Sequence, residues 1–393
     1  MHRRINAISV VLAFGLMTSA CASSSSPAHL TYRLGHFPAV PTVSFSRANA
    51  RALQAVLDAA AKNGLPGITA TVLAADGRAW SGAAGTADGV HPVEVRSQFG
   101  IASFTKTVIA AEVMRLSERG LLRLSDPVSE HLPSNFHFDT NGATIRNLLH
   151  MESGIPDPAL NYTDPVLADP QREWTAREVL ATVPAYRSKP GDHFVYEDAN
   201  YMLLGLVIEA TTGTSVAAAL RSSVLADPRV SSMVYQPAER PRGPLALPFL
   251  GSQARPNIIK VGGGYLPTKA EASEANGSGC MASDSGALAL WGYLLFGGQL
   301  VSEQSLMAMT DFGTGVYGLG VFNQTKDNAW RGAGQAIGNG GWDNGGYSSV
   351  LAVLPSEGIV ISVMTNRAGD PKALVFPVAE MLASSLQMRA KDR

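Results

Sequence analysis

The chain has 393 residues, of which 46% are hydrophobic and 16% are charged, and its formal net charge is −1. This composition is typical of a globular protein with a large core. The near-neutral charge and the lack of a long basic run give no reason to expect a nucleic-acid partner. The 39 glycines and 23 prolines favour a loop-rich enzyme over a helical bundle.

The N-terminus has the pattern of an export signal. "MHRR" is a cationic start, "INAISVVLAFGLM" is an apolar run too short for a permanent membrane span, and "TSAC" is a small-residue cleavage site. Cleavage before Cys21 resembles processing of a bacterial lipoprotein, although Thr18 stands where that pattern prefers leucine. We therefore expect a signal peptide over 1–20 and a lipidated Cys21 with a polar tether over 21–42.

A lipidated Cys21 would hold the protein at the outer side of the cytoplasmic membrane through a lipid anchor. The alternative is a secreted protein in which Cys21 is incidental. The second cysteine, Cys280, has no internal disulfide partner once Cys21 carries lipid, and the small residues around it in "GSGCMAS" indicate a structural, packed position.

The remaining chain, 43–393, opens with a helix and a hairpin. Apolar residues at helical spacing predict a helix over 47–64, ended by a glycine. The alternating stretch 67–85 contains Asp76-Gly77, which is the sequence signature of a two-residue hairpin turn. A second strong helix is predicted over 103–120, again with a glycine at its end.

The middle of the chain reads as helix and long loop, and the end returns to strands. Helical periodicity occurs in four stretches, and the proline- and glycine-rich stretch 235–275 indicates an extended loop region. The four stretches are 144–155, 175–183, 200–225 and 284–309. Short β-like runs at 317–324, 347–355 and 358–366 precede a closing helix over 371–390.

Strands at both ends of the chain predict one sheet assembled from both termini. The expected α/β part is 43–99 with 311–393, and the expected helical part is 100–310. This is an α/β fold with an antiparallel sheet flanked by helices and an all-helical insertion.

One pair of residues carries a candidate chemistry. Ser103 and Lys106, in "FGIASFTK", are three residues apart and share one helix face. A nucleophilic serine needs a neighbouring base, and burial lowers the pKa of a lysine toward that role. The sequence contains no G-x-S-x-G, H-E-x-x-H or P-loop motif, so neither a metal nor a cofactor is expected.

Taken singly, these residues also have structural interpretations. Lys106 is able to extend its amine to solvent, and Tyr196 is able to serve only as an aromatic at the start of a helix. The glycines over 338–346 fit a loop that needs positive φ. His150 and His193 are interpreted as structural.

Several blocks together resemble the penicillin-binding family of serine hydrolases, which includes class C β-lactamases, D-alanyl-D-alanine carboxypeptidases and related esterases. The resemblance runs from about residue 45 to the C-terminus. It is carried by "FGIASFTK", "LSERGLLRLSDPVSEHLPS", "ATIRNLLHMESGI", "PGDHFVYEDANYMLLGLVIEATTG", "YGLGV" and "GNGGWDNGGYSSVLAVLPSEGIVISVMTNR", in the order and spacing of the family.

The resemblance implies a role for each matching position. Ser103 would be the acylated nucleophile, Lys106 its activating base, and Tyr196 the residue that carries protons to the leaving group. The family's third motif, on an edge strand, falls on Asn339-Gly340-Gly341. The oxyanion hole would be formed by the backbone N–H groups of Ser103 and Trp342.

Two positions depart from the family pattern. Asp198 stands where the second motif has asparagine, and a carboxylate there would favour the ammonium form of Lys106. We therefore expect Lys106 to stay cationic and Tyr196 to be the main base. Asn339 replaces a lysine or histidine that helps hold a substrate carboxylate, and Phe322 stands where some family members have arginine. These changes favour neutral esters or amides over β-lactams.

The expected function is a cell-envelope serine hydrolase of carboxypeptidase or β-lactamase-related type. It would form an acyl-enzyme at Ser103 on peptidoglycan-like peptides or esters. The alternative, motivated by Asp198 and Asn339, is a surface lipoprotein that keeps the fold as a binding module with weakened chemistry.

Overall fold

The computed structural model describes residues 37–391 apart from residues 162, 186–187, 251–252 and 256–257. The expected signal peptide, Cys21 and most of the expected tether therefore lie outside the described residues. Within the described part of the chain no single helix has the length and hydropathy to cross a membrane. The helices α6 (Ala199–Thr212) and α7 (Val216–Ser222) meet the length and hydropathy criterion only as a pair bent by 70°.

The centre of the structure is a seven-stranded sheet with the strand order β1-β3-β2-β12-β11-β10-β9. All neighbouring strands are antiparallel except β1 and β3. The strands are β1 (Val43–Ser44), β2 (Gly67–Ala74), β3 (Arg78–Gly85), β9 (Phe322–Asn323), β10 (Ile337–Asp343), β11 (Tyr347–Leu354) and β12 (Ile359–Thr365).

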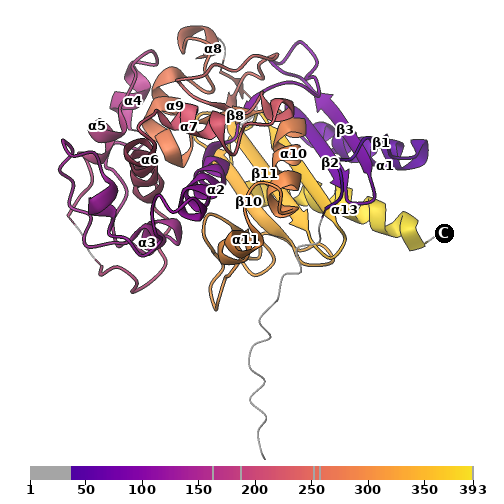
Figure 1. The fold of residues 1–393 in the computed structure, drawn as a ribbon. Coiled ribbons are helices and arrows are strands. Elements are labelled where there is room, and N and C mark those ends of the chain that lie inside the picture. The colour runs from indigo at the N-terminus through magenta and orange to yellow at the C-terminus, as the bar shows by residue number, and fades with distance from the viewer. Residues whose placement is uncertain (1–36, 162, 186–187, 251–252, 256–257, 392–393) are drawn as a thin grey trace, which may run out of the picture. The chain divides into compact units, whose positions relative to one another are not determined.

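The two ends of the chain meet at the middle of this sheet. Strand β2 pairs with β12 over its whole length, from Ile68 opposite Thr365 to Ala74 opposite Ile359. The β2–β3 hairpin turns at Gly77, whose φ of 93° suits glycine. Figure 1 shows the indigo N-terminal strands beside the yellow C-terminal strands.

Helices cover both faces of the sheet. On one face, α1 (Arg47–Lys62) packs against α13 (Phe376–Lys391), and both contact the strands. On the other face, α10 (Ser285–Phe296) packs on β2, β11 and β12. Every residue of these three strands is buried, as expected for strands enclosed on both faces.

Most of the remaining helices gather on one side of the sheet, around α2 and α6 (Figure 1). Helices α2 and α6 pack against each other, and the buried side chains of α6 continue the core of the sheet's α10 face. These helices are α2 (Thr105–Glu118), α3 (Ile145–Leu149), α4 (Asp164–Ala168), α5 (Ala176–Leu180), α6 (Ala199–Thr212), α7 (Val216–Ser222), α8 (Ile258–Val261) and α9 (Lys269–Ala275). Two helices lie elsewhere: α11 (Glu303–Met309), and α12 (Pro371–Leu374), which packs on α13, β10 and β11.

Short elements complete the fold. A three-stranded sheet has the order β4-β8-β5, and β6 pairs with β7. Their bounds are β4 (Phe99–Gly100), β5 (Val234–Tyr235), β6 (Phe249–Leu250), β7 (Gln253–Ala254) and β8 (Met281–Ser283). The 3-10 turns are η1 (Ala102–Phe104), η2 (Val128–His131), η3 (Pro228–Val230) and η4 (Asn276–Ser278).

The predicted α/β fold class is confirmed, with differences in local detail. The helical stretch predicted over 200–225 is two helices, because Gly213 adopts a left-handed φ of 67° and ends α6. The loop region predicted over 235–275 contains the helix α9. The β-like run at 317–324 contributes only the two residues of β9 to the sheet.

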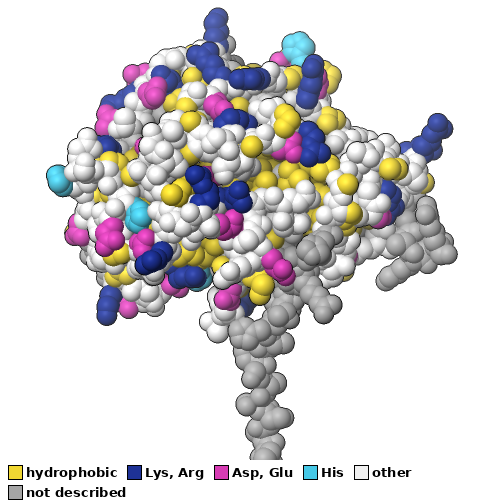
Figure 2. Space-filling model, in the orientation of Figure 1, with side chains coloured by type: hydrophobic (Ala, Val, Ile, Leu, Met, Phe, Trp, Pro, Cys, Tyr) yellow, Lys and Arg dark blue, Asp and Glu magenta, His cyan; other side chains and the backbone are white. Residues whose placement is uncertain are grey.

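The face of the molecule in Figure 2 shows basic and acidic side chains interspersed, with hydrophobic side chains between them. Such a mixed surface agrees with the net charge of −1. The surface charge seen on this face therefore adds no support for a polyanionic partner.

Candidate active site

Ser103 lies at the junction between β4 and α2. It is the middle residue of the turn η1, which leads directly into α2, so it sits in a 3-10 turn rather than in the α-helix that the sequence predicts. The preceding residue, Ala102, has a φ of 44°, which is unusual for a residue with a side chain. Strained backbone of this kind is concentrated at functional sites.

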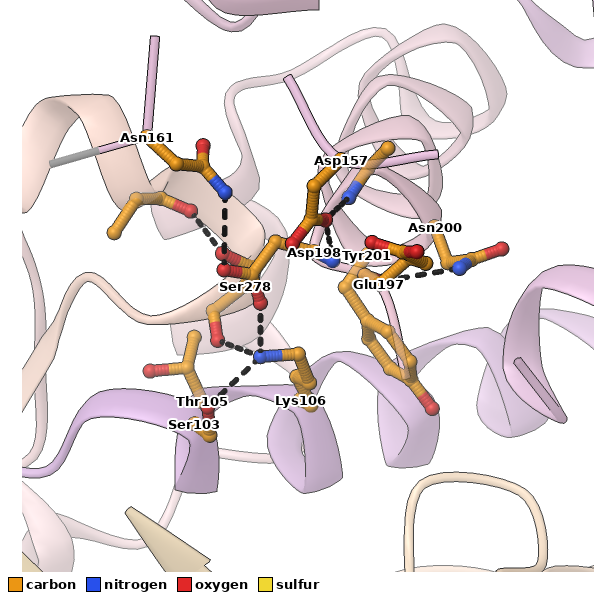
Figure 3. Close-up of polar contacts among 12 residues, drawn as sticks. Ser103, Thr105, Lys106, Asp157, Asn161, Glu197, Asp198, Asn200, Tyr201 and Ser278 are labelled. Atoms are coloured by element: carbon orange, nitrogen blue, oxygen red, sulfur yellow. Dashed lines mark hydrogen bonds and ion pairs between the residues drawn. The ribbon is translucent and has the colours of Figure 1, made fainter. Parts of the chain in front are cut away.

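Lys106 lies one turn further and is completely buried. Its Nζ is 2.9 Å from Ser103 Oγ, 2.8 Å from the Ser278 carbonyl oxygen and 2.6 Å from Asp198 Oδ1 (Figure 3). The carbonyl and the carboxylate only accept hydrogen bonds, so they take two N–H groups of Lys106. The remaining position on the nitrogen is directed at the serine hydroxyl.

The charge state of Lys106 follows from two opposing effects. Burial alone lowers the pKa of an amine, but the Asp198 carboxylate and the Tyr196 side chain raise it by a larger amount. The net result is a pKa of Lys106 above its ordinary value. Lys106 is therefore an ammonium at neutral pH, and it donates its third hydrogen bond to Ser103 Oγ.

Tyr196 lies beside this ammonium, on the loop before α6. The Lys106 nitrogen is 4.9 Å from the centre of the Tyr196 ring. The ring also stacks at 5.8 Å on Phe322 and meets Tyr317 edge-on at 6.0 Å, and Phe194 packs on Tyr317. The structure thus brings Ser103, Lys106 and Tyr196 together, with an aromatic cluster on the Tyr196 side.

Asp198 and its neighbours form the acidic side of the site. Asp157 Oδ1 accepts the backbone N–H of Asp198 and, at 3.4 Å, that of Ala199 at the start of α6. Asn161 Nδ2 lies 3.5 Å from Asp198 Oδ2. The Asp198 side chain is 22% exposed, so part of this carboxylate faces solvent.

Four residues of this region are absent from the sequence-based site: Asp157, Asn161, Glu274 and Ser278. They come from a loop after α3 and from the α9–η4 segment, far from Ser103 in the chain. Ser278 contributes a backbone carbonyl, which leaves no signal in residue type. Asp157 and Glu274 are isolated acidic residues without a motif, so only the fold reveals them.

Strand β10 approaches η1 closely at Gly341. A Cβ on Gly341 would stand 2.0 Å from the Ile101 carbonyl oxygen and 2.7 Å from Ser349 Oγ. Glycine is therefore required for the contact that places the turn η1 against the sheet. Trp342 follows and is 48% exposed at the same end of β10.

Asn339 is not presented to solvent. Its side chain is completely buried and donates from Nδ2 to Thr107 Oγ1 at 2.9 Å on α2. It therefore ties β10 to the helix that carries Lys106, and the structure does not place its amide where a substrate carboxylate would lie. Strand β9 pairs only with Ile337 and Gly338 of β10, so Asn339, Gly340 and Gly341 pair with β11 alone.

Other residues noted in the sequence lie apart from this site. Cys280 is buried, and burial raises the pKa of its thiol. His150 pairs with Glu152 at 3.0 Å, and His193 lines a surface pocket of about 810 Å³ with Lys189. Across the described ranges no three His, Cys, Asp or Glu side chains are arranged to hold a metal ion.

A buried lysine bonded to a serine, on a turn that leads into a helix and lies against an antiparallel sheet, fits a serine hydrolase of the β-lactamase and penicillin-binding type. Residues 49–379 match the family described as Beta-lactamase, and the chain belongs to this family. The family and the enzyme class predicted from sequence are thereby confirmed.

Curated relatives match part of the chain. Protein flp of Staphylococcus aureus (strain COL) is 32% identical over 123 residues, which are 30% of this chain and 24% of that protein. Penicillin-binding protein 4* of Bacillus subtilis (strain 168) is 29% identical over 144 residues, 34% of this chain and 30% of that protein. The matched segments thus span less than a third of either relative.

Solved structures share the fold over nearly the whole chain. D-amino acid amidase from Ochrobactrum anthropi SV3, complexed with L-phenylalanine amide, has a TM-score of 0.74 at 22% identity and covers 88% of this chain and 100% of that one. A D-stereospecific amidohydrolase from Streptomyces sp. has a TM-score of 0.67 at 24% identity, over 83% and 97% of the chains. At these identities the likeness concerns the fold.

Proposed function

We propose that this protein hydrolyses amides or esters through an acyl-enzyme at Ser103, and that its substrates carry no carboxylate next to the reacting bond. The observation that carries the proposal is the contact of the buried Lys106 nitrogen with Ser103 Oγ at 2.9 Å. Asp198 and the Ser278 carbonyl pair two N–H groups of this buried amine, and the third N–H group is directed at the Ser103 hydroxyl.

The proposed acylation begins with Lys106 as an ammonium. Its N–H bond to Ser103 Oγ stabilises the negative charge that develops on the serine, while Tyr196, the proposed base, accepts the serine proton. Ser103 Oγ then attacks the carbonyl carbon. The resulting oxyanion would be held by the backbone N–H groups of Ser103 and Trp342.

Collapse of the tetrahedral intermediate expels the leaving group, which takes the proton back from Tyr196. A water molecule then gives its proton to Tyr196 and attacks the acyl-enzyme, which releases the acid and frees Ser103. Each half of this cycle moves one proton to Tyr196 and returns it. The aromatic cluster of Phe194, Tyr196, Tyr317 and Phe322 would line the leaving-group side, because Tyr196 belongs to it.

The preference for uncharged leaving groups follows from two residues, Asn339 on β10 and Phe322 on β9. Asn339 is turned into the protein interior, and Phe322 rather than a cation stacks on Tyr196. Free carboxylates would have no charged partner at these two positions, and a charge-assisted bond is worth about 1.5–3 kcal/mol. Amides such as the L-phenylalanine amide bound to the D-amino acid amidase, or neutral esters, fit this site better than D-Ala-D-Ala peptides.

A fluorophosphonate probe tests the proposal directly. Mass spectrometry of the intact protein is expected to show one adduct on Ser103, lost in Ser103→Ala. A substrate panel of p-nitrophenyl esters, p-nitroanilides, nitrocefin and a D-Ala-D-Ala peptide should show turnover of the first two. A protein that folds normally but shows no Ser103-dependent adduct would instead support the binding-module alternative, which Asp198 and Asn339 motivate.

The place of action is part of the same proposal. The leader and Cys21 support an exported protein held on the outer side of the cytoplasmic membrane. Radiolabelled palmitate incorporation in the wild type and not in Cys21→Ser would support the anchor. Release of the unlabelled wild-type protein into the medium would support plain secretion.

A further inference from the structure

Acidic side chains outnumber basic ones around Lys106. The carboxyl cluster, as we call it, consists of Asp157, Glu197, Asp198 and Glu274. Lys106 neutralises Asp198 through their 2.6 Å ion pair. Among the described residues no ion pair engages the other three members. The site therefore holds more acid than its own base balances.

Two acceptor groups at this cluster have no partner among the described residues. Glu274 is 1% exposed, and both of its carboxyl oxygens lack a hydrogen bond. The Asn161 Oδ1 atom, whose amide nitrogen reaches Asp198 at 3.5 Å, is likewise buried and unbonded. Unmade hydrogen bonds of buried groups are costly, so such groups in a folded protein call for an explanation.

The excess of acidic groups also raises the pKa values of two members of the cluster. Burial and the charges of Asp198 and Glu197 raise the pKa of Asp157 to about 8. Burial and the charges of Asp198, Asp157 and Glu271 raise the pKa of Glu274 to about 9. Both groups are therefore protonated at neutral pH, and a cation placed among them would favour their ionised forms.

We propose that the carboxyl cluster, with Asn161, binds an ammonium group of the substrate, so that the enzyme selects amides or esters whose acyl part carries an amine. The N–H groups of an ammonium can donate both to carboxylates and to an amide oxygen, which are the acceptors present here. This inference rests on the proposed function for its link to catalysis, although the binding itself can be measured separately.

The position of the cluster limits where that amine sits. Asp198 Oδ1 is 2.6 Å from Lys106 Nζ, which is 2.9 Å from the nucleophilic oxygen. Asp198 is thus two contacts from the reacting atom. An amine on the carbon next to the carbonyl, or one carbon further, is close enough to reach it. Amino acid amides and amino acid esters satisfy this condition.

Calorimetry on the Ser103→Ala protein, which cannot turn over substrate, tests the subsite. The ligands are phenylalaninamide, as each enantiomer, and 3-phenylpropanamide, which has the same skeleton without the amine. The amine is expected to improve the dissociation constant ten- to a hundredfold, the range of a charge-assisted hydrogen bond. At pH 7.5, binding of phenylalaninamide should also release protons, seen as a dependence of the heat on the ionisation enthalpy of the buffer.

Two variants in that background assign the effect to the cluster. Glu274→Gln and Asp157→Asn should each reduce the preference for phenylalaninamide at least fivefold and diminish the proton release. Glu112→Gln is the matched control, because Glu112 is a buried carboxyl on α2 with a raised pKa that faces Ser223 and Val224 instead. Its binding should equal that of the parent.

The outcomes separate this inference from the proposed function. Equal affinity for the two ligands, or a loss of preference in Glu112→Gln as large as in Glu274→Gln, would overturn the ammonium subsite. Ser103 labelling by fluorophosphonate in the wild type decides the proposed function independently. Amine-dependent binding without labelling would leave the subsite standing in a binding protein.

Discussion

Replacing Asp198 by Asn removes the charge opposite Lys106 and nearly preserves shape. At 2.6 Å, the attraction between the two charges is about 6 kcal/mol with an effective dielectric constant of 20, before the cost of burying both charges is counted. Removing one partner of a buried pair costs about 3–5 kcal/mol in comparable cases. Loss of the Lys106 proton limits the cost, because keeping an ordinary lysine neutral at pH 7 requires roughly 5 kcal/mol.

The pH dependence of this loss has a defined sign. In the wild type the pKa of Lys106 is raised, so the stabilisation is fully present below about pH 10 and is lost as the pH rises through the folded-state pKa. In Asp198→Asn burial dominates and lowers the pKa of Lys106, so the penalty is largest at low pH. The difference in unfolding free energy should shrink by up to about 1.4 kcal/mol per pH unit between pH 8 and 10.

Urea denaturation at pH 7, 8 and 9 measures both quantities. Asp327→Asn is the control, since Asp327 forms a 2.8 Å pair with Lys372 that is partly exposed, and such pairs contribute about 0–1 kcal/mol. A loss below about 1 kcal/mol for Asp198→Asn at pH 7 would refute the assignment of Lys106 as a buried, ion-paired ammonium. An unchanged rate and pH profile of Ser103 labelling would refute the role of Tyr196 as main base.

Four further predictions follow from the same geometry. Tyr196→Phe should lower kcat/KM for a p-nitrophenyl ester about 10²–10⁴-fold without changing the circular dichroism spectrum; a loss under tenfold would exclude proton transfer by this phenol. Gly341→Ala should destabilise the fold by about 1–3 kcal/mol and reduce Ser103 labelling, because its Cβ would overlap the Ile101 carbonyl, whereas Gly315→Ala, where a Cβ has ordinary space, should do neither. Glu274→Gln should raise the unfolding free energy by roughly 1–3 kcal/mol at pH 8 and little at pH 4, because the folded-state pKa of about 9 makes stability fall as the pH rises toward it; equal stability of the two proteins at pH 8 would contradict a protonated, unpartnered carboxyl. Nitrocefin should be hydrolysed slowly or not at all, and rapid turnover in a spectrophotometric assay would show that the missing cation on the strand does not govern substrate choice.

Much of the fold was predictable because its signals are local. The hairpin at Asp76-Gly77, the helix α1 and the mostly apolar strands β11 and β12 each follow from spacing and turn chemistry within a few residues. The helix α9 lies in a stretch of high proline and glycine density, and it forms because Thr268 caps it by accepting the backbone N–H of Glu271. A single capping residue is too weak a signal to identify in advance.

The candidate site also contains residues that the sequence could identify and residues that only the fold reveals. Ser103 and Lys106 could be named from their spacing of three residues, and Tyr196 from the resemblance of its block to the family; the structure brings the three together. The inward orientation of Asn339 could not be foreseen, since it depends on which face of β10 meets α2. The influence of the Asp157 charge on the pKa of Glu274 joins segments more than a hundred residues apart in sequence, so no local pattern shows it.

The pairing of β2 with β12 has a consequence for how the chain reaches its native state. Ala74 lies opposite Ile359, so the centre of the sheet joins residues near the two ends of the chain. During synthesis the β2–β3 hairpin lacks the partner of β2, so the edge of β2 that pairs with β12 stays unpaired until almost all of the polypeptide has emerged. Contacts of such long range slow folding and expose unpaired strand edges to other chains. A holding chaperone that shields this hairpin should therefore increase the yield of soluble protein.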